Sequence, residues 1–154
     1  MMNKTAPAIY LAARYSRRPE VSGYGAALRA LGYVVTSRWH DGESHQASED
    51  DLLRTGGRGW NFASEDLADI DVAGLVVSFT EPPRELNRNR GGRHVEFGYA
   101  LARRKELWLV GPRENVFHHI VAKRFETWPE VYADLEWMLM AGAWAGPGAG
   151  ARLG

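Results

Sequence analysis

Glu96 is the side chain whose position in the sequence best suits nucleophilic chemistry. It lies in the first turns of a helix predicted over residues 94–104, just after Gly91 and Gly92. Free N–H groups at a glycine-rich helix start can hold an anion, and the helix dipole favours an ionised carboxylate there. An ionised carboxylate that is held in place can attack an anomeric carbon. Acids at helix starts also serve stability alone, so a first-turn structural role for Glu96 is the alternative.

A second carboxylate is expected from the acidic helix predicted over residues 61–71. Asp66 and Asp69 both lie in this helix. Two carboxylates in different surroundings can divide the nucleophile and acid roles of a cleavage reaction. Either aspartate could handle the proton of the leaving group, and the local sequence does not choose between them. Because Glu65 and Asp71 are close by, a solvated helix face without function is the alternative.

Two groups of basic residues could bind a phosphate. Arg14, Ser16 and Arg17 follow the first apolar run, and the arginines of residues 88–93, Arg90 among them, precede the helix of the candidate nucleophile. Arginine offers phosphate a bidentate fork, although arginines scattered over a surface are the alternative. The chain has neither the glycines of a P-loop after its first run nor a GxGxxG motif after a strand. These absences argue against a Walker NTPase and a Rossmann dehydrogenase.

A metal centre and an organic cofactor are not expected. The histidines at positions 40, 45, 94, 118 and 119 match no regular metal spacing, and adjacent histidines at 118 and 119 cannot share one helix face. The chain has no cysteine, which excludes disulfides, thiolate catalysis and cysteine-ligated zinc.

The elements that must position these residues alternate along the chain. Short apolar runs predict four strands, and amphipathic spacing predicts the helices between and after them. The strands are expected at residues 8–13, 33–36, 74–80 and 107–110, and the helices at 21–31, 61–71, 94–104 and 128–140. Such alternation predicts an α/β domain with a parallel sheet, which places ligands at the carboxyl ends of its strands. The polar stretch at 40–59 is predicted to be a long loop.

Composition indicates one compact domain with no global charge. The chain has 154 residues, of which nineteen are basic and nineteen acidic. We expect a single domain at residues 1–142 and a flexible Gly/Ala-rich tail at 143–154. Neutral charge argues against a nucleic-acid polymer as partner. The apolar run near the N-terminus is too short for a signal peptide or a membrane span, so a cytoplasmic protein is expected.

The order of several segments resembles the nucleoside 2-deoxyribosyltransferase family, including its relatives that hydrolyse deoxynucleoside 5'-monophosphates. The segment GGRHVEFGYALA at residues 91–102 is the most specific part. IYLAA at 9–13, EDLADI at 65–70 followed by GLVVSF, and KELWLVG at 105–111 complete the pattern. The resemblance covers most of residues 8–112. It implies a flavodoxin-like (Rossmann-like) three-layer sandwich with a five-stranded parallel sheet, and a homodimer or higher homo-oligomer.

The resemblance also implies roles for individual residues. Glu96 would be the nucleophile, Asp66 the general acid/base, and Tyr10 a residue that positions the nucleophile or the sugar. The loop before the nucleophile would hold a 5'-phosphate through Arg90 and Gly92. The loop after the first strand would contribute Ser16 with Arg14 or Arg17. Apart from the resemblance, the segment at residues 111–118 is predicted at the ligand edge of the sheet, so Asn115 or His118 could contact substrate across an oligomer interface.

The expected activity is therefore cleavage or transfer of the N-glycosidic bond of a small nucleotide or nucleoside, with retention. The transferases of the family carry an acidic residue where this chain has Arg90, which favours a 2'-deoxynucleoside 5'-monophosphate over a free 2'-deoxynucleoside. Rival hypotheses are a non-catalytic nucleotide-binding or sensing domain and an NAD glycohydrolase of the TIR type, which would also use a helix-borne glutamate. An arginine-rich nucleic-acid module is a further rival, which the neutral charge disfavours.

Overall fold

The protein is described by a computed structural model, in which residues 5–41, 58–83 and 91–144 are placed well enough to describe. The predicted loop at 40–59 and the basic segment before the Glu96 helix lie largely outside these ranges. Within the described residues, no helix is long and apolar enough to cross a membrane.

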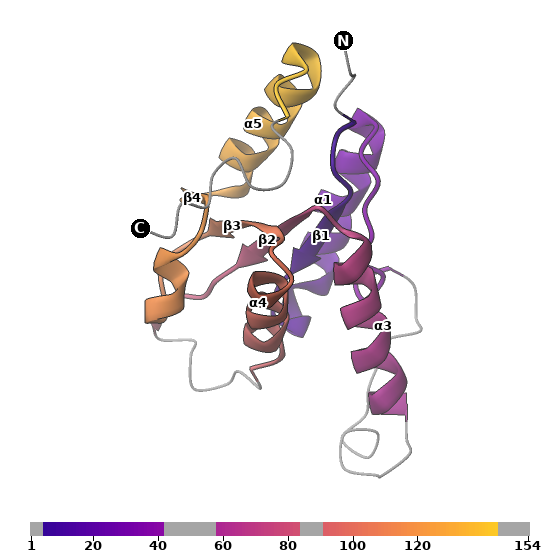
Figure 1. Cartoon of the computed structure of the whole chain (residues 1–154), viewed down its shortest axis with the longest axis vertical. Coiled ribbons are helices and arrows are strands. Elements are labelled where there is room, and N and C mark those ends of the chain that lie inside the picture. Colours follow the sequence, from indigo (N-terminus) through magenta and orange to yellow (C-terminus); the bar gives the residue numbers. More distant parts are fainter. Residues whose placement is uncertain (1–4, 42–57, 84–90, 145–154) are drawn as a thin grey trace.

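A parallel sheet forms the centre of the molecule (Figure 1). Its strands are β1 (Ile9–Ala12), β2 (Leu75–Phe79), β3 (Glu106–Val110) and β4 (Lys123–Phe125), hydrogen-bonded in the order β1-β2-β3-β4. Every residue of β1 and β2 is buried. This burial agrees with the continuous apolar runs that predicted them, because a parallel strand is covered on both faces.

The predicted second strand at residues 33–36 is reduced to one bridge. Val35 pairs in parallel with Ile9, on the side of β1 away from β2. Two main-chain bonds hold it, from Ile9 N–H to Val34 O at 2.9 Å and from Thr36 N–H to Ile9 O at 2.8 Å. The described sheet thus has four strands rather than five, because this segment contacts the sheet only around one residue. Its position on the far side of β1 still gives the neighbour order of a flavodoxin-like sheet.

Strand β4 was not predicted from the apolar runs. Its sequence is Lys-Arg-Phe, and all three residues are only partly buried. An edge strand has one paired side and can carry charged residues, so it lacks the apolar signature of the central strands.

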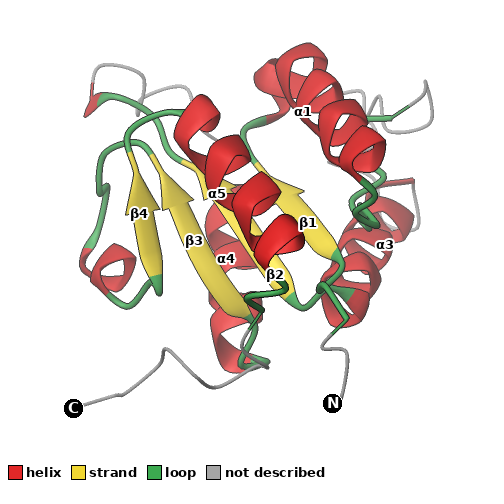
Figure 2. Cartoon of the chain, turned by 90° about the horizontal axis from the view of Figure 1, so that it is seen from above, coloured by secondary structure: helices red, strands yellow, loops and turns green. Residues whose placement is uncertain are grey.

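In the described part of the chain, four α-helices cover the sheet in two layers, with α1 and α5 on one face and α3 and α4 on the other (Figure 2). Their bounds are α1 (Arg18–Leu31), α3 (Arg58–Val72), α4 (Gly92–Ala102) and α5 (Trp128–Ala141), and two short 3₁₀ helices are η1 (Tyr15–Arg17) and η3 (Val116–His119). The predicted three-layer α/β architecture is confirmed.

Two of these helices have ends with the expected chemistry. Helix α1 ends before Gly32, as predicted. Helix α5 begins with a reciprocal capping box between Thr127 and Glu130, and Pro129 lies in its first turn. Helix α4 begins two residues before the predicted start. Helix α3 begins at Arg58, before the predicted start at residue 61.

The buried face of α4 is not made of its apolar residues alone. Val95 is 66% exposed. The buried residues are Arg93, Phe97 and Ala100, at spacings of four and three. Hydrophobicity alone predicts that Arg93 is exposed. Its burial is possible because it forms the ion pair described below.

The packed body extends to Trp144, two residues beyond the boundary predicted at 142. The Trp144 ring is 4% exposed and stacks on Trp108 with ring centroids 5.9 Å apart. Its indole N–H donates to the Tyr33 hydroxyl at 3.2 Å, and that hydroxyl donates to the Leu135 carbonyl at 2.7 Å. The start of the predicted tail is therefore part of the core, and residues 145–154 lie outside the described ranges.

Gly111, directly after β3, provides a test of the packing at the carboxyl edge of the sheet. Its φ is +109°, and a Cβ there would lie 2.5 Å from Thr80 Oγ1 and 3.3 Å from Thr80 O. We predict that Gly111→Ala lowers the free energy of unfolding by about 2–3 kcal/mol, because it adds both backbone strain and a clash. Urea denaturation measures this change.

Gly23→Ala is the matched control for that substitution. Gly23 lies within α1, and a Cβ there would meet nothing within 4 Å. We expect Gly23→Ala to raise the free energy of unfolding by about 0.5–1 kcal/mol, because alanine has a higher helix propensity than glycine. Equal effects of the two substitutions would contradict the assignment of strain to Gly111.

Candidate active site

Tyr10 and Glu96 meet between the sheet and helix α4. Tyr10 lies in the middle of β1 and its side chain is fully buried. The Tyr10 hydroxyl donates a hydrogen bond to Glu96 Oε1 at 2.9 Å. Glu96 is the fifth residue of α4 and is partly exposed. A residue fixed in the sheet therefore orients the carboxylate that the sequence identified as a nucleophile.

The protonation of Glu96 differs from the expectation that the helix dipole keeps it ionised. Burial, and then the negative charge of Asp66, raise the pKa of Glu96 to about 8, although the Tyr10 hydrogen bond lowers it. Desolvation of a carboxylate outweighs the dipole here, because Glu96 is in the second turn of α4 rather than at its first residues. In the absence of substrate, the carboxyl group holds its proton more tightly than an ordinary glutamate.

Asp66, on the neighbouring helix α3, is the second acid of the site. Burial, and then the charges of Asp69 and Glu65, raise the pKa of Asp66 to about 7, against an opposing effect of Arg38. Its Oδ1 is buried and has no hydrogen-bond partner among the described residues. We refer to Glu96 and Asp66 as the acid pair. Because each negative charge disfavours the other, the pair loses its two protons in separate steps.

The structure distinguishes Asp66 from Asp69, which the local sequence left equivalent. Asp69 accepts from the Arg38 side chain through Nε at 3.0 Å and Nη2 at 2.7 Å, and from the Arg38 main-chain N–H at 3.2 Å. Its carboxylate is thus fully engaged. Asp66 raises the pKa of both Glu96 and Tyr10 by its charge, which places it on the same side of the site.

The basic residues after β1 are already engaged by neighbouring groups. Arg14 Nε donates to Ser16 Oγ at 2.5 Å, and its Nη1 lies 3.8 Å from Glu81 Oε2. Arg17 donates to Glu20 at 2.6 and 2.9 Å and to Glu81 at 3.3 Å. A phosphate at Arg17 would have to compete with two carboxylates, so Arg14 with Ser16 is the better phosphate candidate in this loop.

The basic segment before α4 contributes less than expected. Arg90 lies outside the described residues. Gly92 is the first residue of α4, and no side chain of the described residues caps the helix start at Gly91. Arg93, also counted with the basic cluster, is instead buried. It forms a two-pronged ion pair with Glu114, one contact being Nη2 to Oε1 at 2.7 Å. This ion pair joins α4 to the segment after β3 and makes Arg93 a structural residue.

Asn115 also has a structural contact. Its side-chain oxygen accepts from the Phe117 N–H at 3.0 Å and caps the short helix η3. The side chain is otherwise exposed. It is therefore open to contact from outside this chain, and nothing in the described residues directs it toward the acid pair.

His94, Glu114 and His118 bring possible metal ligands within 4.8 Å of one another. Their hydrogen bonds do not fit a metal centre. The Glu114 N–H donates to His118 Nδ1 at 3.0 Å, so the proton of the neutral ring is on Nε2 and neither nitrogen is free to bind a cation. Burial lowers the pKa of His118, which favours this neutral ring. The Glu114 carboxylate is also neutralised by Arg93.

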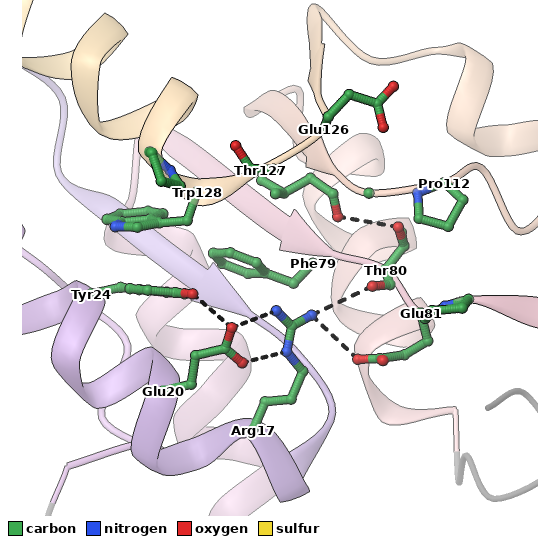
Figure 3. Close-up of a pocket in the computed structure, with 14 residues that line it drawn as sticks. Arg17, Glu20, Tyr24, Phe79, Thr80, Glu81, Pro112, Glu126, Thr127 and Trp128 are labelled. Carbon is green, nitrogen blue, oxygen red and sulfur yellow. Dashed lines mark hydrogen bonds and ion pairs between the residues drawn. The ribbon is translucent and has the colours of Figure 1, made fainter.

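A cavity of about 390 Å³ lies on the opposite face of the sheet from the acid pair. Figure 3 shows it between α1 and α5, with Phe79 and Trp128 on its walls and Arg17 at its base. Neither member of the acid pair lines it. The Arg17 guanidinium is held there by Glu20, Glu81 and the Thr80 carbonyl, and it lies over the Phe79 ring at 5.2 Å. Glu126 also lines the cavity, and its Oε1 lies 2.8 Å from Arg124 Nη1. We place the chemistry at the acid pair, because every carboxylate that lines the cavity is held in an ion pair.

Comparisons with known proteins identify the fold. No family model and no curated protein matches the sequence. Among solved structures, the Clostridium botulinum CMP N-glycosidase BcmB is similar with a TM-score of 0.53 and 18% identity, over 84% of this chain and 98% of that one. A 2-deoxyribosyltransferase from Bacillus psychrosaccharolyticus is similar with a TM-score of 0.53 and 22% identity, over 82% and 94% of the two chains. The chain therefore shares the fold of these two enzymes over most of its length.

Arg38 is the residue of the site that sequence reasoning missed. It follows the second apolar run, so the rule that places functional residues at the carboxyl ends of strands could have found it. Its contacts with Glu65 and Asp69 on α3 depend on the packing of two distant segments.

The raised pKa of Glu96 predicts a pH-dependent stability. The pKa of Glu96 is about 8 in the folded protein and 4.5 in its ordinary, unfolded state. Its contribution to stability is therefore fully present below about pH 4.5 and is lost as the pH rises toward 8. We predict that Glu96→Gln is more stable than the native chain by at least about 1 kcal/mol at pH 9, and that this advantage shrinks toward pH 5. Thermal unfolding at both pH values measures it.

Glu20→Gln is the control for this effect. Arg17 holds the pKa of Glu20 below its usual value, so removal of this carboxylate is expected to give no gain in stability as the pH rises. A pH-independent difference between Glu96→Gln and the native chain would show that the Glu96 carboxyl has an ordinary pKa.

Proposed function

We propose that this chain cleaves or transfers the N-glycosidic bond of a 2'-deoxynucleoside 5'-monophosphate or 2'-deoxynucleoside through a covalent glycosyl-Glu96 intermediate. The observation that carries the proposal is the Tyr10 hydrogen bond to Glu96 at 2.9 Å beside a second acid, Asp66. Two structural neighbours with the same fold are a CMP N-glycosidase and a 2-deoxyribosyltransferase, which supports this class of reaction.

In the first step, the Glu96 carboxylate attacks C1' from the face opposite the base. The bond between C1' and the base nitrogen breaks, its electron pair goes to the base, and Asp66 donates a proton to the base. The sugar passes through an oxocarbenium-like transition state, and its missing 2'-hydroxyl makes positive charge at C1' less costly. Tyr10 keeps one Glu96 oxygen in place, so the other oxygen is the attacking atom.

In the second step, water attacks C1' of the glycosyl ester and Asp66 takes a proton from the water. The bond between C1' and the Glu96 oxygen breaks, and its electron pair restores the Glu96 carboxylate. The two displacements give net retention. A second base in place of water gives transfer instead of hydrolysis. The proposed steps are carried by the two carboxylates and the tyrosine.

The phosphate of a nucleotide substrate is proposed to lie between the loop after β1 and the start of α4. Arg14 and Ser16 supply the first side, and Gly92 and Arg90 the second. The N–H groups at the start of α4 meet no capping side chain among the described residues, which supports an anion at this point. Arg17 and Asn115 are weaker members of the set, because each already has the contacts described above.

A homodimer or higher homo-oligomer is proposed as the active form. Val116, Phe117 and Ile120 are 74%, 57% and 40% exposed and form an apolar surface around η3. Burial of this surface against a second copy would be favourable and would bring Asn115 into an interface. The cytoplasmic location stays a prediction from the sequence.

The acid pair predicts a bell-shaped pH profile. The reaction needs Glu96 ionised and Asp66 protonated. This is the minor form of the pair with one proton, because Glu96 has the higher pKa and holds that proton more tightly than Asp66. With pKa values of about 7 for Asp66 and about 8 for Glu96, we expect kcat/KM to be highest near pH 7–8. Below this range Glu96 is protonated and cannot attack, and above it the leaving base receives no proton. Initial rates between pH 5 and 10 measure the profile.

Release of free base is the direct test of the function. The chain is incubated with deoxynucleosides, their 5'-monophosphates, CMP and NAD, with and without a second base, and the products are separated by chromatography. We expect base release from the deoxynucleoside monophosphates, reduced at least about 10³-fold by Glu96→Gln and Glu96→Ala. Asp66→Asn is also expected to reduce the rate of base release. The reduction should be smaller for bases that leave easily without a proton than for bases that need one.

Each other outcome has a defined meaning. Base exchange with free nucleosides alone would show that the chain is a transferase. The proposed phosphate-binding role of the arginines would then be unsupported. Release of nicotinamide from NAD would identify an NAD glycohydrolase. Nucleotide binding with no base release from any compound, or full turnover by Glu96→Ala, would overturn the proposal.

A further inference from the structure

Arg38 connects the two acidic residues that flank Asp66 along helix α3. Its Nη1 lies 2.6 Å from Glu65 Oε1, and its Nη2 lies 2.7 Å from Asp69 Oδ1. Nε adds contacts to both oxygens of Asp69 at 3.0 and 3.1 Å. One guanidinium therefore binds the carboxylates of the residues one before and three after the proposed catalytic acid. Oδ1 of that acid has no hydrogen-bond partner among the described residues.

The segment that carries Arg38 is held firmly against β1. The Leu11 N–H donates to Ser37 Oγ at 3.2 Å, and Trp39 Nε1 donates to the Leu11 carbonyl at 2.7 Å. Both neighbours of Arg38 are buried, whereas the Arg38 side chain is 54% exposed. These contacts fix the main chain of Arg38 next to β1, the strand that carries Tyr10.

Five charged or titratable groups interact with Asp66 from the elements packed around it. Glu65 and Asp69 come from its own helix, Glu96 from α4, Tyr10 from β1, and Arg38 from the segment after Val35. Arg38 is the cation of this set. Without it, two carboxylates and the nucleophile would surround a buried acid with no opposing charge among the described groups that act on it.

We propose that Arg38 is a positioning residue that holds Glu65 and Asp69 and offsets their charge, and so sets the pH at which Asp66 releases its proton during turnover. The inference rests on the proposed function, because it assigns Asp66 the role of acid. It concerns electrostatics rather than contact with substrate. Arg38 itself touches Glu65 and Asp69 and makes no contact with Glu96 in the described structure.

The proposal predicts opposite effects for two neighbouring substitutions. Arg38→Met removes the cation and retains an unbranched side chain, so Asp66 should hold its proton to higher pH. Asp69→Asn removes an anion and retains the shape, so Asp66 should release its proton at lower pH. In both variants the main-chain N–H of residue 38 still donates to residue 69, which preserves the local anchor. A purely structural role would shift both variants in the same direction.

The first measurement is the pH profile of kcat/KM. Because Asp66 has the lower pKa of the pair, the acid limb near pH 7 follows its proton, and the alkaline limb near pH 8 follows that of Glu96. We expect the acid limb to move up by about half to one pH unit in Arg38→Met and down by a similar amount in Asp69→Asn. The alkaline limb should change less. Arg38→Lys retains the charge and is expected to keep the native acid limb. Addition of 0.5 M salt should reduce the shift of Arg38→Met, because the side chain is more than half exposed.

The second measurement does not need turnover. The carboxyl ¹³C signal of Asp66, assigned with Asp66→Asn, is followed by NMR over the same pH range. Its midpoint should rise in Arg38→Met and fall in Asp69→Asn. If Glu96→Ala retained turnover while these midpoints moved as stated, the proposed function would fail and the electrostatic role of Arg38 would stand.

Arg103→Met is the matched control. Arg103 also pairs with an α3 carboxylate, Asp71, at 2.8 Å, but it does not act on Asp66. It should leave both the profile and the Asp66 midpoint unchanged. Equal shifts in Arg38→Met and Arg103→Met, shifts of the same sign in Arg38→Met and Asp69→Asn, or no shift in either would overturn the proposal. Should Arg38→Met fail to fold, Asp69→Asn and Arg38→Lys carry the test.

Discussion

The site depends on a hydrogen bond between a residue fixed in the sheet and a residue on a helix. Tyr10 cannot move, since it is buried in the middle of β1, and its hydroxyl holds one oxygen of Glu96. The same burial that fixes the tyrosine withdraws water from the carboxylate and from Asp66 nearby. The packing of α3 and α4 against the buried strand therefore determines both where the acid pair lies and how tightly it holds its protons.

The fold was largely predictable from the sequence because its central strands and helix ends have local signatures. The runs that became β1, β2 and β3 are apolar throughout, and Gly32 and the residues around Pro129 mark helix ends. Elements whose stability comes from one-sided contacts were harder to predict. Strand β4 is a charged edge strand, and the segment at Val35 is held by two main-chain bonds around Ile9. Neither has a local pattern that distinguishes it from a loop.

The same division applies to the site. The resemblance singled out Glu96, Asp66 and Tyr10 as a group, and the structure brings Tyr10 and Glu96 into contact with Asp66 close enough to influence both. The sequence could not show that Arg93 is buried against Glu114, or that Arg38 engages Asp69, because these pairs join residues 21 and 31 positions apart. For the same reason the ionisation of Glu96 was expected wrongly. The helix dipole is a local property, whereas desolvation depends on the whole tertiary surroundings.

The placement of Tyr10 inside the sheet has a consequence for how such an enzyme can diversify. The proposed chemical groups are set by core packing, so most changes near them would cost stability as well as rate. Arg14 and Ser16 belong instead to the connection after β1, and Asn115 is exposed at the start of η3. Under the proposed function, substitutions there would alter which substrate is accepted while the acid pair and Tyr10 remain intact. Selection could thus change the substrate many times over without rebuilding the chemistry.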